Sequence, residues 1–222
     1  MPCFVEKIRR VRKSLDIFKK INIGIDIEEE LRNALENNIT LKKTEWDLRT
    51  FAPDGELLDI GGCGEYTIMN NTRCPLIIID NDPDRYIENK RVKTYDMDAQ
   101  SMQFENKRFQ NITIFYTLMY MEKEEIKNTL SECRRVLKES GHIYIWDIVF
   151  GEESDITTYV VPIKVIGKRA ASDYCFASNG IYERRDHHFY KELIVQCGLK
   201  IFQEEIKDGG IYFDCVYGEE KG

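Results

Sequence analysis

The chain contains 222 residues, of which 42% are hydrophobic and 32% are charged, and its formal net charge is −7. These values are typical of a soluble globular protein with one domain, or with one domain and an appendage. An apolar run of about 18 residues, the length needed to span a membrane, occurs nowhere, and the acidic balance disfavours general attraction to nucleic acid.

The seven cysteines are scattered, and none forms a Cys-x-x-Cys pair. This pattern indicates neither a zinc site nor a redox motif, and the presence of only three histidines argues against a metal centre. We interpret most of the thiols as small core residues in a reducing compartment. The segment from Met1 to Lys7 carries charge where a secretion signal would be apolar, so we expect a cytoplasmic protein.

The first fifty residues predict a helical cap. One amphipathic stripe consists of Phe4, Ile8, Val11, Leu15 and Phe18. The first twenty residues also hold seven lysines and arginines against two acidic residues, which we interpret as a solvated helix face rather than a phosphate-binding surface.

Two further helical pieces complete this predicted cap. A second helix begins at Asp26, where Glu29 completes a capping box. A third runs from Leu41 to Phe51 and contains Trp46, which we interpret as a core anchor. We therefore divide the chain into a cap, residues 1–50, and a main domain, residues 51–222.

From residue 56 the pattern changes to short apolar strands separated by helical segments. Such strands, apolar on both faces, predict a parallel sheet covered on both sides. We expect strands at 56–60, 76–79, 92–96, 112–115 and 142–148, with a helix at 123–137.

The last third of the chain ends in an antiparallel hairpin. Residues 151–180 are interrupted by Gly151, Pro162, Gly167 and Gly180, so we expect an irregular lid or connection there. A helix at 188–197 follows and ends at Gly198. Alternating strands at 199–206 and 211–217 then flank an Asp-Gly-Gly turn.

The run from Leu57 to Gly64 is the strongest single signal of function. An apolar strand ends on Asp59 and Ile60 and is followed by Gly61, Gly62 and Gly64. Glycine permits a sharp turn or a close approach to a ligand, and open α/β sheets use such loops to hold nucleotides. A tight loop without a ligand has the same pattern, so the neighbouring motifs decide.

Several motifs in order resemble the class I S-adenosylmethionine-dependent methyltransferases, over roughly residues 56–217. The similarity is strongest to the small-molecule branch related to quinone biosynthesis. The matching segments are Leu58–Gly64, Asp80, Asp98–Phe104, Phe109–Met121 and Glu132–Gly141. The resemblance implies a Rossmann-like three-layer α/β/α sandwich whose mostly parallel seven-stranded sheet ends in the antiparallel hairpin.

The resemblance also implies a set of residues that bind S-adenosylmethionine. These are Asp59, Gly61, Gly62, Cys63, Gly64, Asp80, Asn81, Asp98, Ala99 and Tyr116. The glycine loop would curl around the methionine part of the cofactor, Asp80 would bind the ribose hydroxyls, and Asp98 with Ala99 would flank the adenine. A carboxylate can accept two such hydroxyl hydrogen bonds, which favours this role of Asp80 over capping of the turn after it. Asp96 is the rival of Asp98, and the adjacent Ala99 favours Asp98.

Methyl transfer from a sulfonium mainly requires alignment of the acceptor and exclusion of water, and a general base helps where the acceptor carries a proton. Candidate bases are Tyr116, His187 and His188, with Asp147 a weaker one. Packing explains Tyr116 equally well, and helix capping explains the two histidines better. No metal is expected.

We therefore predict a methyltransferase that acts on a small-molecule acceptor. One alternative is an RNA methyltransferase that uses the basic N-terminal helix, although no Asn-Pro-Pro-Tyr or Asp-Pro-Pro-Tyr motif is present. Another is a non-catalytic scaffold with a degraded cofactor site. It is suggested by Tyr66, which replaces a motif glycine, and by the short segment between Gly62 and Asp80. A dehydrogenase fits less well, because Thr67 stands where the third glycine of its motif would be.

Overall fold

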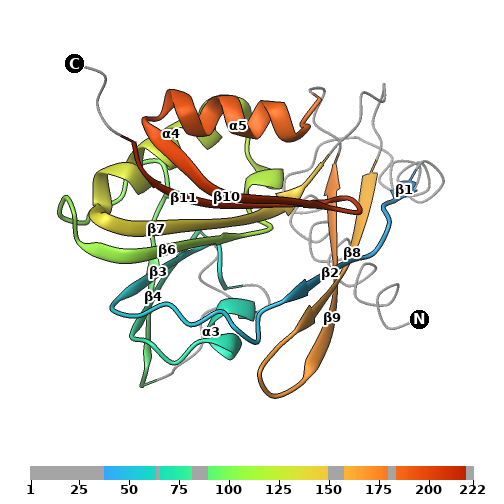
Figure 1. The fold of residues 1–222 in the computed structure, drawn as a ribbon, viewed down its shortest axis with the longest axis horizontal. Coiled ribbons are helices and arrows are strands. Elements are labelled where there is room, and N and C mark those ends of the chain that lie inside the picture. Colours follow the sequence, from blue (N-terminus) through green and yellow to red (C-terminus); the bar gives the residue numbers. More distant parts are fainter. Residues whose placement is uncertain (1–37, 64–65, 82–89, 150–157, 180–183, 219–222) are drawn as a thin grey trace, which may run out of the picture.

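The computed structural model describes residues 38–63, 66–81, 90–149, 158–179 and 184–218, which form two sheets and several helices (Figure 1). The first elements in chain order are β1 (Asn38–Thr40), β2 (Thr44–Asp47), β3 (Leu57–Ile60), α3 (Thr67–Asn71), β4 (Leu76–Asp80), β5 (Val92–Asp96) and β6 (Phe109–Phe115). They are followed by the 3-10 turn η2 (Leu118–Tyr120), α4 (Lys123–Val136), β7 (Leu137–Ile148), β8 (Thr158–Ile166), β9 (Ala171–Asn179), α5 (His187–Gln196), β10 (Leu199–Lys207) and β11 (Gly210–Tyr217).

The main sheet has seven strands in the order β10-β11-β7-β6-β3-β4-β5. The five strands from β7 to β5 are parallel, whereas β11 pairs antiparallel with both β7 and β10. This mixed α/β architecture, a mainly parallel sheet that ends in an antiparallel hairpin, confirms the predicted fold class.

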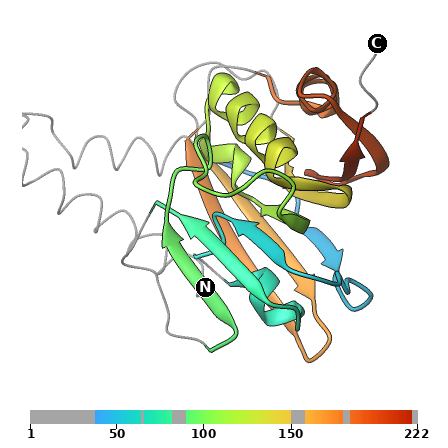
Figure 2. The ribbon, with the colours of Figure 1, turned by 90° about the vertical axis from the view of Figure 1, so that its left-hand side faces the viewer.

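Alternation along each strand sends side chains to two separate cores. On β4, Ile77 and Ile79 belong to one core, while Leu76 and Ile78 belong to the other. The first core lies beneath α4 and α5, which Figure 2 shows together on one side of the sheet. Helix α4 begins with a reciprocal capping box between Glu122 and Glu125 and buries one face, which includes Ile126 and Leu130.

The second core lies between the main sheet and a smaller four-stranded sheet. In this smaller sheet β8 pairs in parallel with β1 and β2, and β9 pairs antiparallel with β8. Side chains of β8 pack with Leu57, Ile78 and Trp146 of the main sheet. Figure 1 shows β2, β8 and β9 beside the end of the sheet toward which β7 points. In the described residues this layer is therefore made of strands and the short α3, where helices were expected.

The helix expected from Leu41 to Phe51 is wrong, because Thr44–Asp47 form a strand. Thr44 and Trp46 are buried while Glu45 and Asp47 are more exposed, which is the two-residue period of a strand. Trp46 is a core residue, as predicted. The helices expected nearer the N-terminus lie outside the described residues. The division at residue 50 stays a prediction, and β2 pairs across it with β8.

The irregular segment expected at 151–180 is also wrong, because its described part forms the antiparallel strands β8 and β9. The buried residues Tyr159, Val161, Ile163 and Val165 alternate along β8. Pro162 interrupts this pattern in the sequence. It is tolerated because the parallel pairing with β1 ends at Val160 and that with β2 begins at Ile163, so neither strand pairs with it.

Five described cysteines are free, and three of them, Cys63, Cys133 and Cys215, are buried. Cys175 on β9 is the exception to the predicted pattern, because it is disulfide-bonded.

Candidate functional site

The sequence-predicted residues meet at one edge of the main sheet, where the parallel strands β3, β4, β5 and β6 end. Register places Ile60, the last residue of β3, between Ile79 on β4 and Ile114 on β6. Ligands of open α/β sheets bind outside the carboxyl ends of such strands. The structure therefore brings together the glycine loop after β3, Asp80 at the end of β4, and the segment after β6.

The glycine loop is locked to the segment that follows β6. Gly61 has a φ of +72°, and a Cβ atom at this position would lie 2.5 Å from both Oγ1 and Cγ2 of Thr117. The Thr117 hydroxyl donates a hydrogen bond to the Ile60 carbonyl at 3.1 Å, and the Gly61 amide donates to the Ile79 carbonyl at 2.8 Å. Only glycine satisfies both the backbone angle and the close approach.

Asp59 forms the floor of this loop. A Cβ atom at Gly62 would lie 2.1 Å from Asp59 Oδ2, so the loop backbone rests directly on the carboxyl group. Thr113 Oγ1 donates to Oδ1 at 2.7 Å, whereas the buried Oδ2 has no hydrogen-bond partner among the described residues. Burial, with a smaller contribution from Asp80, raises the pKa of Asp59 to about 7 against the hydrogen bond from Thr113.

Asp80 holds the other side of the loop by a hydrogen bond. Its Oδ2 accepts a hydrogen bond from the Cys63 amide at 3.1 Å, and the residue is half-buried at the tip of β4. Asn81, which follows it, is exposed. A carboxylate at a strand end that also holds the glycine loop is well placed to meet a polar ligand.

The two residues predicted to flank the adenine differ in exposure. Asp98 is exposed, and its Oδ1 accepts from the Gln100 amide at 2.8 Å. The Ala99 side chain is buried in the core beneath α4. The rival Asp96 is exposed at the end of β5, directly opposite Asp80 in register.

Tyr116 occupies a packing position. Its hydroxyl accepts a hydrogen bond from Trp46 Nε1 at 2.8 Å, and its ring stacks on Phe176 with a centroid separation of 5.4 Å. It is 2% exposed, and burial raises its pKa well above the usual value for tyrosine. The sequence interpretation missed this aromatic cover, which is supplied by β2 and β9.

The candidate histidines lie in the first turn of α5. His187 Nε2 is 3.0 Å from Glu204 Oε2, and the ring stacks on Phe213, so both contacts are to the C-terminal hairpin. His188 is exposed. The N-cap of α5 is Asp186, which accepts from the Phe189 amide at 2.9 Å.

Asp147 is fully buried near the end of β7, beneath η2. Its Oδ2 accepts from the Met119 amide at 3.3 Å, and burial raises its pKa to about 7 although backbone donors and Arg185 oppose this. The sequence interpretation missed Arg185, which is also fully buried and donates to the Leu118 carbonyl at 2.9 Å. Nothing in its local sequence distinguishes it from the exposed Arg184 beside it.

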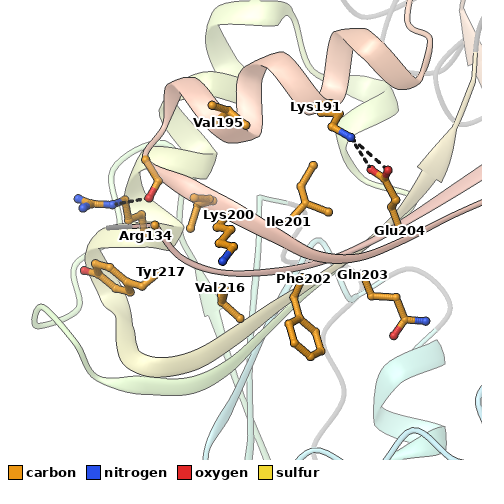
Figure 3. Close-up of a pocket in the computed structure, with 13 residues that line it drawn as sticks. Arg134, Lys191, Val195, Lys200, Ile201, Phe202, Gln203, Glu204, Val216 and Tyr217 are labelled. Carbon is orange, nitrogen blue, oxygen red and sulfur yellow. Dashed lines mark hydrogen bonds and ion pairs between the residues drawn. The ribbon is translucent and has the colours of Figure 1, made fainter. Parts of the chain in front are cut away.

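A groove of about 870 Å³ lies elsewhere, between α5 and the edge strand β10 (Figure 3). Figure 3 shows Lys191 and Val195 of α5 on one side and Lys200, Ile201 and Glu204 of β10 on the other. Leu199 pairs with Tyr217, near the residues of β11 that pair with the amino-terminal part of β7. The groove therefore extends from the end of the sheet opposite the glycine loop.

Residues 57–141 match a family model described as a methyltransferase domain. An S-adenosylmethionine-dependent methyltransferase from Clostridium acetobutylicum is similar over 94% of this chain and 99% of its own, with 14% identity and a TM-score of 0.52. The fold is that of S-adenosylmethionine-dependent methyltransferases. A second such protein, from Methanosarcina mazei, is 15% identical over 75% of this chain and 94% of its own, with a TM-score of 0.53.

The methyltransferase fold also occurs in the [4+2]-cyclase SpnF, which is 14% identical over 77% of this chain and 78% of its own, with a TM-score of 0.55. No curated protein matches the chain.

None of the described helices is long and apolar enough to cross a membrane. Within the described ranges, no group of three or more histidine, cysteine, aspartate or glutamate side chains is placed to hold a metal ion.

Proposed function

We propose that this protein binds S-adenosylmethionine and transfers its methyl group to a small-molecule acceptor. The observation that carries the proposal is the glycine loop between Asp59 and Asp80. The loop contacts Asp59, Asp80 and Thr117, which all lie at the strand ends where ligands of such sheets bind. The match to a methyltransferase domain over the same residues supports this proposal.

The residues present fit the cofactor. Gly61 and Gly62 let the loop backbone lie directly against Thr117 and Asp59, and the methionine part would lie along this backbone. Asp80 accepts hydrogen bonds from the ribose hydroxyls. The exposed Asp98 and the backbone of Ala99 border the adenine. Asn81 continues the segment of Asp80, whereas Gly64 lies outside the described residues. The cofactor supplies a methyl group on an activated sulfur, and the chain aligns this methyl group with the acceptor.

We assign the transfer step to alignment and exclusion of water rather than to a tyrosine base. The Tyr116 hydroxyl is buried and accepts a hydrogen bond from Trp46 Nε1, so we propose that Tyr116 forms part of the wall of the site. His187 is held by Glu204, and His188 remains the exposed candidate for a base.

The small-molecule class of the acceptor rests on two observations. The acidic chain disfavours polyanions, and the strand β9 packs against η2 beside the proposed methyl-transfer site. The motif resemblance extends the proposal to acceptors of the quinone-biosynthesis type. RNA methylation and a non-catalytic scaffold are the alternatives that the experiment separates.

Calorimetric titration with S-adenosylhomocysteine and S-adenosylmethionine tests the proposal. We expect the wild type to bind both and Asp80→Ala to lose roughly 100-fold or more in affinity, because hydrogen bonds to a charged group contribute about 1.5–3 kcal/mol each. Glu139→Ala is the control, since it removes an exposed carboxylate that contacts only Lys107 among the described residues.

Three results would change the proposal. Absence of both heat and a thermal shift with either ligand at millimolar concentration would refute it. Tight binding without transfer to any small molecule would favour the scaffold. Salt-sensitive RNA binding that is lost on deletion of residues 1–20 would favour the RNA enzyme.

A further inference from the structure

The turn η2 borders the proposed site but is too short to hold itself in place. Its own hydrogen bonds run from the Tyr120 amide to the Thr117 carbonyl and from the Met121 amide to the Leu118 carbonyl. A single 3-10 turn has little stability of its own. The residue before it, Thr117, is the one that contacts Gly61 and Ile60. Thr117 therefore joins the start of η2 to the glycine loop.

Asp147 holds the start of η2 from below. Its Oδ2 accepts from the Met119 amide at 3.3 Å, and its Oδ1 accepts from the Ile148 amide at 2.8 Å. The carboxyl group is wholly removed from solvent. Amides at the start of a turn have no partner within it, so an external acceptor satisfies them.

Arg185 holds the carbonyl groups of the same turn. Its Nη1 donates to the Leu118 carbonyl at 2.9 Å, and its Nη2 donates to the Met121 carbonyl. The guanidinium group also lies 5.5 Å from the centre of the Phe189 ring. One side chain thereby bridges the two ends of η2 and joins them to α5.

Burial of an arginine and an aspartate costs desolvation free energy, so it is an inefficient way to stabilise a fold. Both polar groups lose their hydration on burial, and apolar residues of similar volume often stabilise as well. An apolar pair, however, cannot form hydrogen bonds with the amides and carbonyls of an irregular turn. The chemistry of the pair thus matches the backbone of η2.

We infer that Asp147 and Arg185 are positioning residues that fix η2, and through Thr117 the glycine loop, in the geometry that binds the cofactor. We name this pair the η2 clamp. The consequence for cofactor affinity rests on the proposed function, whereas the consequence for the mobility of η2 does not.

The test compares Arg185→Met, Arg185→Lys and Asp147→Asn with the matched control Arg134→Met. Arg134 also donates to a backbone carbonyl, that of Gly198 at 3.1 Å, and its guanidinium also lies over a ring, that of Tyr217. It lines the groove at the opposite end of the sheet. Two quantities are measured at a temperature where every variant is folded. These are amide hydrogen exchange in the unliganded protein and affinity for S-adenosylhomocysteine.

We expect exchange at Met119, Tyr120 and Met121 to accelerate about tenfold or more in Arg185→Met and Asp147→Asn, with a parallel loss of affinity. Arg185→Lys should recover much of both, because an ammonium group still donates to carbonyls. Arg134→Met should change neither. If Arg185→Met does not fold, the isosteric Asp147→Asn carries the same comparison.

Unchanged exchange at these three amides in the clamp variants would overturn the inference. Accelerated exchange with unchanged affinity would overturn its link to the cofactor. If the wild type binds no cofactor, the proposed function fails, and the exchange measurement still decides whether the clamp fixes η2.

Discussion

Tyr66 has a backbone conformation that ordinarily favours glycine. It stands where the methyltransferase resemblance expects a glycine, and its φ of 52° and ψ of 31° lie in the left-handed region. A residue with a Cβ atom adopts this region at a cost of about 1–2 kcal/mol, whereas glycine adopts it freely. Tyr66 therefore keeps a backbone conformation that a glycine at this position could adopt freely.

Gly61→Ala should destabilise the protein by about 2–5 kcal/mol, because it combines left-handed strain with overpacking against Thr117. Thr117→Ala removes the two atoms that lie 2.5 Å from the new Cβ and should recover part of the loss in the double variant. Gly209→Ala is the control, since its nearest neighbour lies 3.6 Å away. Urea unfolding of all four proteins measures the coupling. Purely additive losses would mean that the contact with Thr117 does not matter.

Tyr116→Phe separates packing from proton transfer. Removal of the hydroxyl leaves the buried Trp46 N–H without its acceptor, at a cost of about 1–3 kcal/mol in unfolding free energy. Methyl transfer per folded molecule should stay near the wild-type rate. Tyr144→Phe is the comparison, because the Tyr144 hydroxyl lies 3.5 Å from its partner and is half-buried. A loss of transfer of roughly 100-fold or more in Tyr116→Phe would instead identify its hydroxyl as the general base.

Among the elements, α3 shows how far sequence interpretation reaches. The short spacing between the glycine loop and Asp80 predicts a clipped helix that ends near Asn70-Asn71-Thr72, and α3 ends at Asn71. The Asn71 side chain donates to the Thr67 carbonyl, and Thr72 donates to the Ile68 carbonyl. Arg91 then donates to the carbonyls of Met69 and Thr72. The bonds from Asn71 and Thr72 are local and can be read from sequence, whereas the two from Arg91, which precedes β5, cannot.

The same distinction explains what else the sequence could and could not predict. Strands β3 and β4 are apolar runs, so their existence follows from local pattern. Strands β6 and β7 begin at Phe109 and Leu137, earlier than the expected starts at 112 and 142. In β8 the alternating signal is present but is broken by Pro162. The contacts of Trp46 with Tyr116 and of Arg185 with Leu118 join residues 70 and 67 positions apart. No local pattern encodes such contacts, so the cover of the site and the η2 clamp appear only in the structure.

Two buried carboxyl groups affect the stability of the molecule as a whole. Burial raises the pKa of both Asp59 and Asp147 from 3.8 to about 7. Because the folded state then binds more protons than the unfolded state between these values, stability falls as pH rises from about 4 to about 7. A shift of this size corresponds to a few kcal/mol per group, on the order of 1.4 kcal/mol per pKa unit.

Thermal unfolding between pH 5 and pH 8 should therefore show a midpoint that decreases as pH rises. Asp59→Asn removes one of the two contributing carboxyl groups and should make the decrease about half as steep, because Asp147 still ionises. Glu139→Gln, at an exposed residue whose pKa is lowered by Lys107, should leave it unchanged over this range. An equally steep decrease in Asp59→Asn would show that the pKa of Asp59 is not raised in the folded protein.

The chemistry that the molecule performs is a separate question from its architecture. The similarity to a [4+2]-cyclase as well as to methyltransferases shows that this fold serves more than one reaction. Binding of the cofactor and transfer of its methyl group are for this reason separate measurements.

The smaller sheet has a consequence for how the chain is made. Glu45 on β2 accepts from Lys164 on β8 at 2.7 Å, across 119 positions of sequence. During synthesis β2 leaves the ribosome long before β8 exists, so β2 has no partner strand while the parallel sheet is assembling. A nascent chain stalled before residue 158 would carry an unpaired, partly apolar strand. Such a chain is where we would look for chaperone contact or aggregation, rather than in the finished protein.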